Sequence, residues 1–188
     1  QRLERLRALP GVTRDDARIA LHANLELPRE IDLAITSGAE GIGLLRTEFM
    51  FMNRDTPPDE EEQYLTLRTL VEGMNGQPVT IRTLDVGGEK LAYSLGNHIL
   101  DAVNPALGLR AIRFSLRQPK LFESQVAAIL RAAHHGPVRM LLPMISTVGE
   151  VQQVRTVVAR VQRRLKRRGV ETSNLPPIGI MIEVPGAA

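Results

Sequence analysis

Gly38-Ala-Glu-Gly-Ile-Gly-Leu-Leu-Arg46-Thr-Glu-Phe-Met50 is the stretch from which the organisation of this chain can be predicted. Its apolar residues indicate a short buried strand over residues 41–48, and they are Ile42, Leu44 and Leu45, with Phe49 just beyond. A parallel strand that is buried on both faces is almost entirely apolar, so the charged residues Arg46 and Glu48 at its carboxyl end are informative. They place a guanidinium group where α/β folds bind their ligands.

Segments with the pattern of a strand alternate with segments with the pattern of a helix along the whole chain. The expected strands are residues 19–25, 41–48, 79–85, 138–145 and 178–185. The expected helices are residues 28–37, about 56–75, 106–117, 119–133 and 147–168. This order predicts an α/β protein with a right-handed βα series and a parallel sheet, either open or closed into a barrel.

The length of the chain limits how much of a barrel it can form. A complete TIM-type (β/α)8 barrel needs about 250 residues, and this chain has 188. We therefore expect roughly the first five βα units of such a barrel, in a chain that is a piece of a longer protein. We expect residues 1–18 to be the end of an inter-domain helix or linker, since Leu3, Leu6 and Leu9 recur at a spacing of three. Residues 19–188 are then the N-terminal part of the barrel domain.

The composition excludes several classes of protein. The content of 43% hydrophobic and 24% charged residues is ordinary for a soluble globular protein. There is no cysteine, which excludes disulfides and thiolate metal sites. No apolar run approaches the length of a membrane span and no signal peptide opens the chain, so we expect a cytoplasmic protein without a membrane partner.

A basic segment, residues 155–168, carries seven arginines and lysines and no acidic residue. A nucleic-acid interface is one interpretation of such a segment. The alternative is an amphipathic helix, because Val151, Val154, Val158 and Leu165 repeat at helical spacing. Cations in a last helical turn are favoured by the helix dipole. No aromatic residues are interleaved for base stacking, so the helix is favoured and no nucleic-acid partner is expected.

Charged residues at the ends of three predicted strands suggest the chemistry. Arg46, Arg82 and Glu183 each lie in or after such a strand, and in a barrel these ends meet at one mouth. Guanidinium groups bind phosphates and carboxylates bidentately. A carboxylate buried in the apolar run 178–185 needs a cation, either an arginine or a metal, and Mg²⁺ typically takes one or two carboxylates plus substrate oxygens. The residues therefore predict a phosphorylated small-molecule site with Mg²⁺, suited to phosphoryl transfer.

Other candidate residues have an ordinary structural interpretation beside the functional one. We interpret His22 as a hydrogen-bonded core residue rather than a catalyst, and Asn24 as the better ligand candidate of that strand. The acids of residues 60–62 are interpreted as a solvated first helical turn rather than a metal site. Met144 fits an apolar ligand pocket and a core position equally well.

Four motifs in order along the chain resemble the PEP-utilising enzymes. They are Gly41-Ile-Gly-Leu-Leu-Arg-Thr-Glu-Phe49, Arg82-Thr-Leu-Asp-Val-Gly-Gly-Glu-Lys90, Asn104-Pro-Ala-Leu-Gly-Leu-Arg-Ala-Ile-Arg113 and Ile182-Glu-Val-Pro185. The resemblance is closest to the Enzyme I family, the phosphoenolpyruvate-protein phosphotransferases of the bacterial sugar phosphotransferase system. Pyruvate phosphate dikinase and PEP synthase share the first motif and are less similar around the second.

The resemblance implies a (β/α)8 barrel that binds phosphoenolpyruvate (PEP). Arg46 and Arg82 match arginines that bind the PEP phosphate, and Glu183 matches a carboxylate that binds Mg²⁺. Arg110 matches an arginine near the site, and we include it among the PEP-binding residues. In the family, PEP passes its phosphoryl group to a histidine of another domain and then to the carrier protein HPr, which leaves pyruvate, and the barrel carries the dimer contact.

The resemblance also implies that catalytic parts lie outside these 188 residues. No histidine here lies in a motif like the phosphorylated one, and the cysteine that protonates the enolate is absent. We therefore assign no catalytic residue within the chain and expect the chain alone to be inactive. Two alternatives remain at this stage, namely a barrel of a dikinase or PEP synthase, and a non-catalytic binding or scaffold fragment with the same fold.

Overall fold

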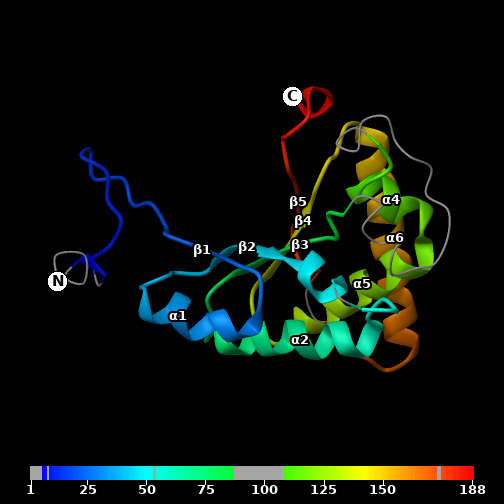
Figure 1. Ribbon diagram of the computed structural model, residues 1–188, viewed down its shortest axis with the longest axis horizontal. Coiled ribbons are helices and arrows are strands. Elements are labelled where there is room, and N and C mark those ends of the chain that lie inside the picture. Colours follow the sequence, from blue (N-terminus) through cyan, green and yellow to red (C-terminus); the bar gives the residue numbers. More distant parts are fainter. Residues whose placement is uncertain (1–5, 8, 53, 87–107, 173–174) are drawn as a thin grey trace.

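A five-stranded parallel sheet, with strand order β1-β2-β3-β4-β5, organises the chain (Figure 1). The computed structural model describes residues 6–7, 9–52, 54–86, 108–172 and 175–188. The strands are β1 (Ala23–Leu25), β2 (Ile42–Arg46), β3 (Val79–Arg82), β4 (Val138–Leu142) and β5 (Ile178–Ile180). Since each strand pairs with the next one in the chain, the predicted parallel α/β arrangement is confirmed.

Helices connect the successive strands of this sheet. They are α1 (Ile31–Thr36), α2 (Glu60–Gly73), α4 (Ala111–Arg117), α5 (Pro119–Ala132) and α6 (Val148–Arg167), with 3₁₀ turns η2 (Pro28–Glu30), η3 (Thr47–Phe51) and η4 (Pro185–Ala187). In Figure 1, α1 and α2 run beneath the strands, and α4 and α6 stand at the opposite end from the N-terminus. Among the described residues, no helix combines the length and apolar character needed to cross a bilayer.

The core lies between the sheet and the helices. Each strand contributes apolar side chains, such as Ile42 from β2, Ile81 from β3 and Met140 from β4, and all of these are buried. The helices cover them with buried apolar stripes that include Leu67 of α2 and Ile129 of α5. Burial of such side chains stabilises by roughly 1.5–3 kcal/mol each, which explains why the strands form where the apolar runs lie.

Two helices begin at residues whose side chains cap them. The side chain of Asp59 accepts a hydrogen bond from the N–H of Glu62 at the start of α2. At the start of α6, Thr147 and Glu150 form a reciprocal capping box. Such caps satisfy N–H groups that have no partner inside the helix. The helix interpretation of the basic segment is confirmed, because α6 contains most of it.

An ion-pair cluster joins α2, α5 and α6. The carboxylate of Glu60 lies 3.1 Å from Arg131 and 3.1 Å from Arg168. Glu123 lies 2.6 Å from Arg164. The interpretation of residues 60–62 as a purely solvated turn is therefore wrong for Glu60, because α5 and α6 bring arginines over it.

The strands are shorter than their apolar runs predicted. The run 41–48 leaves the ladder after Arg46, because the 3₁₀ turn η3 begins at Thr47. The runs 79–85, 138–145 and 178–185 end as strands at Arg82, Leu142 and Ile180. The first run, 19–25, pairs only from Ala23 onward. The residues past each strand end carry the polar groups of the site described below, so their departure from the ladder positions those groups.

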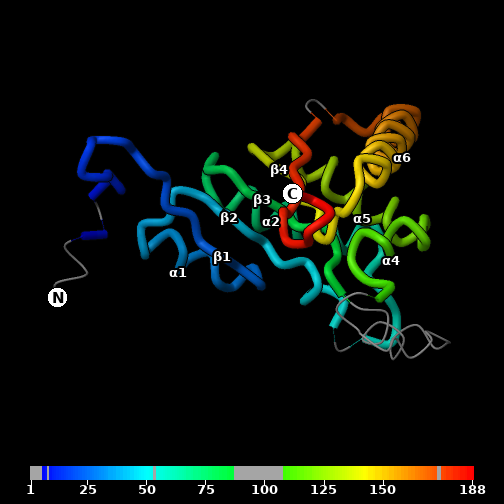
Figure 2. Tube along the Cα trace, turned by 90° about the horizontal axis from the view of Figure 1, so that it is seen from above, coloured from blue at the N-terminus to red at the C-terminus, as the bar shows by residue number. Residues whose placement is uncertain are grey.

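Residues 9–17 extend away from the sheet (Figures 1 and 2), whereas the C=O of Leu21 already accepts from the N–H of Glu40 at 2.8 Å. The described residues of 6–18 contain no α-helix, and Val12 pairs with Arg18 in an isolated antiparallel bridge. Leu3 and most of the predicted helix before Pro10 lie outside the described residues. The predicted domain boundary at residue 18 stays a prediction.

Two further predictions fall partly outside the described residues. The end of the Arg82–Lys90 motif, Gly87-Gly88-Glu89-Lys90, lies there, as does the beginning of the Asn104–Arg113 motif. The helix expected over 106–117 begins at Ala111. Its residues 108–110 are not helical, and Arg110 precedes the helix in an extended conformation.

We predict that this 188-residue chain associates with itself through the open edges of the described sheet. β1 and β5 each pair on one side only, and apolar side chains beside them are exposed, including Ile19, Leu21 and Ile182. Unpaired edges of this kind promote strand pairing between molecules. Light scattering over a concentration series should show a mass that rises with concentration.

The matched variants are Ile182→Lys at the edge and Leu65→Lys on α2, where Leu65 is also exposed. The first should reduce self-association and the second should leave it unchanged. A monodisperse monomer at every concentration would contradict the prediction.

Candidate functional site

Arg46 and Arg82 converge on one carboxylate. They lie opposite each other at the carboxyl ends of β2 and β3. Arg46 Nε donates to Glu48 Oε1 at 3.2 Å, and Arg82 Nη2 donates to the same oxygen at 2.6 Å. Parallel strands carry both arginines to the same edge of the sheet, and η3 turns Glu48 back between them. The predicted convergence of these two residues is confirmed.

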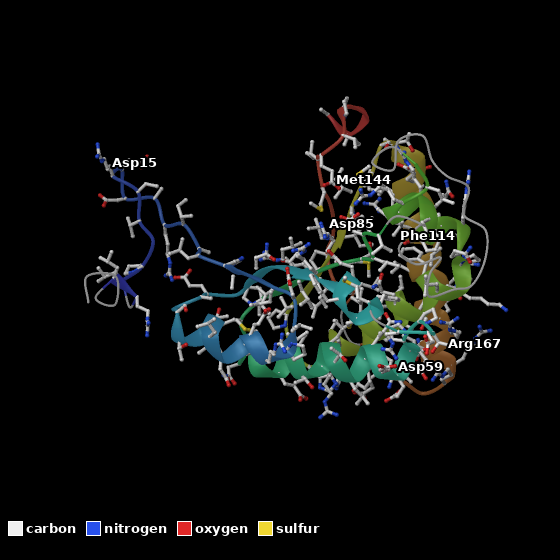
Figure 3. All side chains as sticks on the ribbon, viewed as in Figure 1. Asp15, Asp59, Asp85, Phe114, Met144 and Arg167 are labelled. Carbon is white, nitrogen blue, oxygen red and sulfur yellow. The ribbon has the colours of Figure 1, made fainter. Side chains whose placement is uncertain are left out.

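Asp85 links Arg82 to the third predicted arginine. Its Oδ2 lies 3.0 Å from Arg82 Nη1, and its Oδ1 accepts from Arg110 Nη2 at 2.9 Å. Arg110 directly precedes α4, and the next residue, Ala111, donates its N–H to Val86 O at 3.2 Å. The backbone therefore ties Arg110 to the segment that follows β3, and Figure 3 shows where Asp85 lies in that segment.

The charges of the site alternate in sign along a chain of side chains. Glu26 accepts from Arg46 at 2.5 Å and so extends the series at its outer end. The members are Glu26, Arg46, Glu48, Arg82, Asp85 and Arg110. Three cations are thus balanced by three carboxylates. We refer to these six side chains as the charge chain.

Exposure is graded along the charge chain. The Arg82 side chain is 10% exposed, whereas those of Arg110 and Arg46 are 29% and 38% exposed. A buried pair is strongly destabilised when one partner is lost, but a pair that reaches solvent contributes little. Arg82 is therefore held by its carboxylates, and Arg46 and Arg110 can exchange partners with a ligand.

Three polar atoms in the charge chain have no hydrogen-bond partner among the described residues. They are the donors Arg82 Nε and Arg110 Nε and the acceptor Glu48 Oε2, and all three are buried. A buried polar atom without a partner costs about 1–3 kcal/mol. An oxygen-rich ligand would satisfy the two N–H groups, which makes this a candidate anion site.

Glu183 is positioned differently from the prediction. The structure contradicts the expectation that it is buried within a strand, because β5 ends at Ile180 and Glu183 is exposed. Its Oε1 accepts from the N–H of Met144 at 2.7 Å, and none of the partners described for it is an arginine. The physical reason is that β5 is an edge strand, so residues past its end lie open to solvent.

Glu183 nevertheless lies at the same end of the sheet as the arginines. Met181, two residues earlier, places its sulfur 3.9 Å from Arg82 Nη1. Met144, whose N–H binds Glu183, follows the neighbouring strand β4 (Figure 3). Met144 has φ +57°, an uncommon backbone conformation for a residue with a side chain. Its own side chain is buried, which favours the core interpretation of Met144.

The oxygen chemistry at Glu183 fits one ligand of a divalent ion. Oε1 accepts from one N–H, and a carboxylate oxygen can accept more than one contact. Mg²⁺ uses one or two carboxylates and completes its octahedron with water and substrate oxygens. No group of three His, Asp or Glu side chains within the described ranges is arranged to hold a metal. Glu183 would thus act with ligands from a bound anion.

A buried polar group beside the charge chain was missed by sequence reasoning. Thr47 Oγ1 donates to the C=O of Arg82 at 2.7 Å, and Gln125 Nε2 donates to Thr47 Oγ1 at 3.2 Å. The signal for Gln125 was a polar residue directly before the apolar run 126–130, at helical spacing from Phe122 and Ile129. Glu48 and Asp85 stood within the quoted motifs, but the sequence did not indicate which arginine each would bind.

Neither His22 nor Asn24 contacts a side chain of the charge chain in the contacts that the structure describes. Both side chains are exposed, so the interpretation of His22 as a core residue is wrong. The imidazole lies over Gly43, where an added Cβ would come within 2.9 Å of His22 Cβ. The glycine therefore makes room for the residue before β1, and His22 has a packing role at the sheet edge.

A second carboxylate supports the outer end of the charge chain. Glu30 accepts from the N–H groups of Glu26 and Leu27 at 2.8 and 3.1 Å. These hydrogen bonds, with that of Glu26 the stronger cause, lower the pKa of Glu30 below its ordinary value. Glu30 thereby fixes the backbone from which Glu26 reaches Arg46.

The family described as PEP-utilising enzyme, PEP-binding domain, matches residues 1–188. The chain belongs to this family. This match extends over the whole chain, so the site described above lies within a domain of the PEP-binding type.

Curated relatives of this family member carry the name phosphoenolpyruvate-protein phosphotransferase. The protein of Cupriavidus necator is 46% identical over 188 residues, which cover 100% of this chain and 32% of that protein. Those of Listeria innocua and Staphylococcus carnosus are each 40% identical, over 98% and 100% of this chain and 32% of their own length. The chain thus spans about a third of the relatives it matches, all of which are named as transferases.

We predict that Glu48→Gln lowers the free energy of unfolding by about 1.5–3 kcal/mol, the range for hydrogen bonds to charged groups. The reason is that Glu48 accepts from both Arg46 and Arg82 in a buried position. Urea unfolding followed by circular dichroism would measure the change.

The control is Glu72→Gln, which removes the charge of a surface pair with Arg68 at i,i+4 spacing. Such pairs contribute about 0.5 kcal/mol or less. Equal losses in the two variants would show that the Glu48 pairs are no stronger than a surface ion pair.

We predict that titration of Glu30 makes the free energy of unfolding fall as the pH drops below about 4. Since its pKa is lower in the folded state, its contribution is present above the ordinary glutamate pKa of about 4.3 and is lost as the pH falls through the lowered value. Glu30→Gln, which cannot titrate, should flatten that part of the curve of unfolding midpoint against pH. A curve that the substitution leaves unchanged would contradict this.

Proposed function

We propose that the charge chain is the anion site of a PEP-binding barrel, in a PEP-protein phosphotransferase. The proposal is supported most directly by one observation. The buried Nε–H groups of Arg82 and Arg110 have no partner within the described residues, and Arg82 lies at the carboxyl end of a parallel strand. The family assignment and the relatives' shared name point to the same ligand.

In this proposal the three arginines divide the work of holding PEP. The partly exposed side chains of Arg46 and Arg110 exchange contacts with carboxylates for contacts with phosphate oxygens, because guanidinium forks bind such oxygens bidentately. Arg82 stays bound to Glu48 and Asp85 and turns its free Nε toward the ligand. The carboxylates keep the guanidinium planes fixed before the ligand arrives, which lowers the ordering cost of binding.

Glu183 is the residue of this chain that would hold Mg²⁺. When bound, the ion would neutralise negative charge on the transferring phosphoryl group. Because the charge chain carries no net charge, an anion such as PEP would bind there with excess negative charge, and a cation beside Glu183 would compensate for it. The N–H of Met144 orients Glu183 for that position.

The same proposal extends to the complete protein. The five described strands are the first units of a (β/α)8 barrel, with residues 1–18 as the linker and residues 19–188 as its N-terminal part. A histidine on another domain accepts the phosphoryl group as the P–O bond of PEP breaks, and the enolate left behind takes up a proton to give pyruvate. HPr then receives the phosphoryl group from the histidine. The protein acts in the cytoplasm as a homodimer, and the 188-residue chain alone is inactive.

We predict that Arg46→Met in the full-length protein raises the Kd for PEP by about tenfold or more. Charge-assisted hydrogen bonds contribute about 1.5–3 kcal/mol, and about 1.4 kcal/mol corresponds to a factor of ten. Arg46 is the preferred position because its partly exposed side chain tolerates substitution better than buried Arg82. Isothermal calorimetry with PEP and Mg²⁺ would measure the change.

The control is Arg68→Met, which removes an arginine whose described ion pair is with Glu72 on the surface of α2. It should leave the Kd unchanged. If Arg46→Met and Arg82→Met both fold and bind PEP like the unaltered protein, the charge chain is not the phosphate site.

A further inference from the structure

Gln125 occupies a position where an apolar residue would be expected. It lies in α5 beside Val126 and Ile129, on a helix whose buried residues are otherwise almost all apolar, and it is itself fully buried. Burying an amide is unfavourable unless its hydrogen bonds are made. The side chain of Gln125 must therefore be stabilised by specific partners.

The partners of Gln125 belong to the segment that carries Arg82 and to η3. Its Oε1 accepts from the N–H of Leu84 at 2.9 Å. Its Nε2 donates to Thr47 Oγ1, which in turn donates to the C=O of Arg82 at 2.7 Å. The Gln125 amide thus donates to the Thr47 hydroxyl, and the hydroxyl donates in turn to the Arg82 carbonyl group. All of these groups are buried.

These bonds replace the ladder at the point where β3 ends. After Arg82 the chain turns out of the sheet, so the C=O of Arg82 and the N–H of Leu84 would otherwise be buried without partners. The same short segment carries Asp85, which binds the guanidinium of Arg82. The conformation of this segment sets where that guanidinium lies, and Gln125 and Thr47 set the conformation.

We infer that Gln125 and Thr47 are positioning residues that hold the buried guanidinium of Arg82 in its ligand-binding orientation. Neither side chain is assigned contact with the ligand. The inference rests on the proposed function for its effect on PEP, but its structural part concerns the backbone of residues 82–85 alone. Small displacements of binding groups can reduce activity by up to about 100-fold, so this positioning would matter for affinity as well as for stability.

Gln63 provides a matched comparison within the same molecule. It is a fully buried glutamine on α2, and its amide donates to Pro58 O at 2.9 Å, at the start of that helix. It touches neither Thr47 nor the segment after β3 in the described contacts. Gln63→Met and Gln125→Met therefore each remove a buried amide, but only the second removes a contact to the segment that carries Arg82.

The test measures PEP affinity, thermal unfolding and amide hydrogen exchange in the full-length protein. Both methionine variants should lower the unfolding midpoint. Only Gln125→Met should raise the Kd for PEP, by roughly 10- to 100-fold, as loss of an outer hydrogen-bond partner does at metal-binding side chains. Only Gln125→Met should speed amide exchange in the peptide that contains Leu84. Thr47→Val should act like Gln125→Met, and Thr47→Ser, which keeps the hydroxyl, should restore affinity.

Each outcome separates the positioning role from the proposed function. If Gln125→Met changes neither the Kd nor exchange at Leu84 while Arg46→Met weakens PEP binding, the positioning role is overturned and the function stands. If exchange at Leu84 rises but no variant of Arg46, Arg82 or Gln125 alters PEP binding, the structural positioning stands and the proposed function fails. Equal effects of Gln63→Met and Gln125→Met on Kd would reduce Gln125 to a general stabilising residue.

Discussion

The site depends on one buried carboxylate, Glu48, that two arginines of adjacent strands share. Like-charged guanidinium groups this close repel one another unless an anion lies between them. Glu48 supplies that anion from η3, immediately past β2. The arrangement places Arg46 and Arg82 together before any ligand arrives. A parallel sheet makes it possible, because the residues that follow neighbouring strands meet at one edge.

Electroneutrality explains how several arginines can be partly buried at one edge of the sheet. Each guanidinium of the charge chain has at least one carboxylate partner. Burying an unpaired charge is strongly unfavourable, whereas a paired and hydrogen-bonded charge is tolerated. In the proposed site, the pairs of Arg46 with Glu26 and of Arg110 with Asp85 open to the ligand, while the more buried Arg82–Glu48 pair stays closed.

The sequence allowed the alternation of strands and helices, the parallel sheet and the convergence of Arg46 and Arg82 to be predicted. An apolar run shows that a strand is present but not where its hydrogen bonds to the neighbouring strand stop. The strand ends were therefore predicted several residues too late. The partners of the arginines could not be predicted, because four carboxylates, Glu26, Glu48, Asp85 and Glu183, lie near strand ends in the sequence. Only the three-dimensional path of η3 and of the segment after β3 decides among them. Gln125 lies far from both in sequence.

Glu183 shows how a side chain can be oriented beyond the last strand of the described sheet. Beyond Ile180 the chain lies past the edge strand, and Glu183 is exposed. Its orientation comes from the N–H of Met144, which the left-handed backbone at that residue presents away from the β4 ladder. A strained backbone is stable only where surrounding packing enforces it, and the buried Met144 side chain supplies that packing. The carboxylate is therefore fixed from β4, so its position does not depend on whatever pairs with β5.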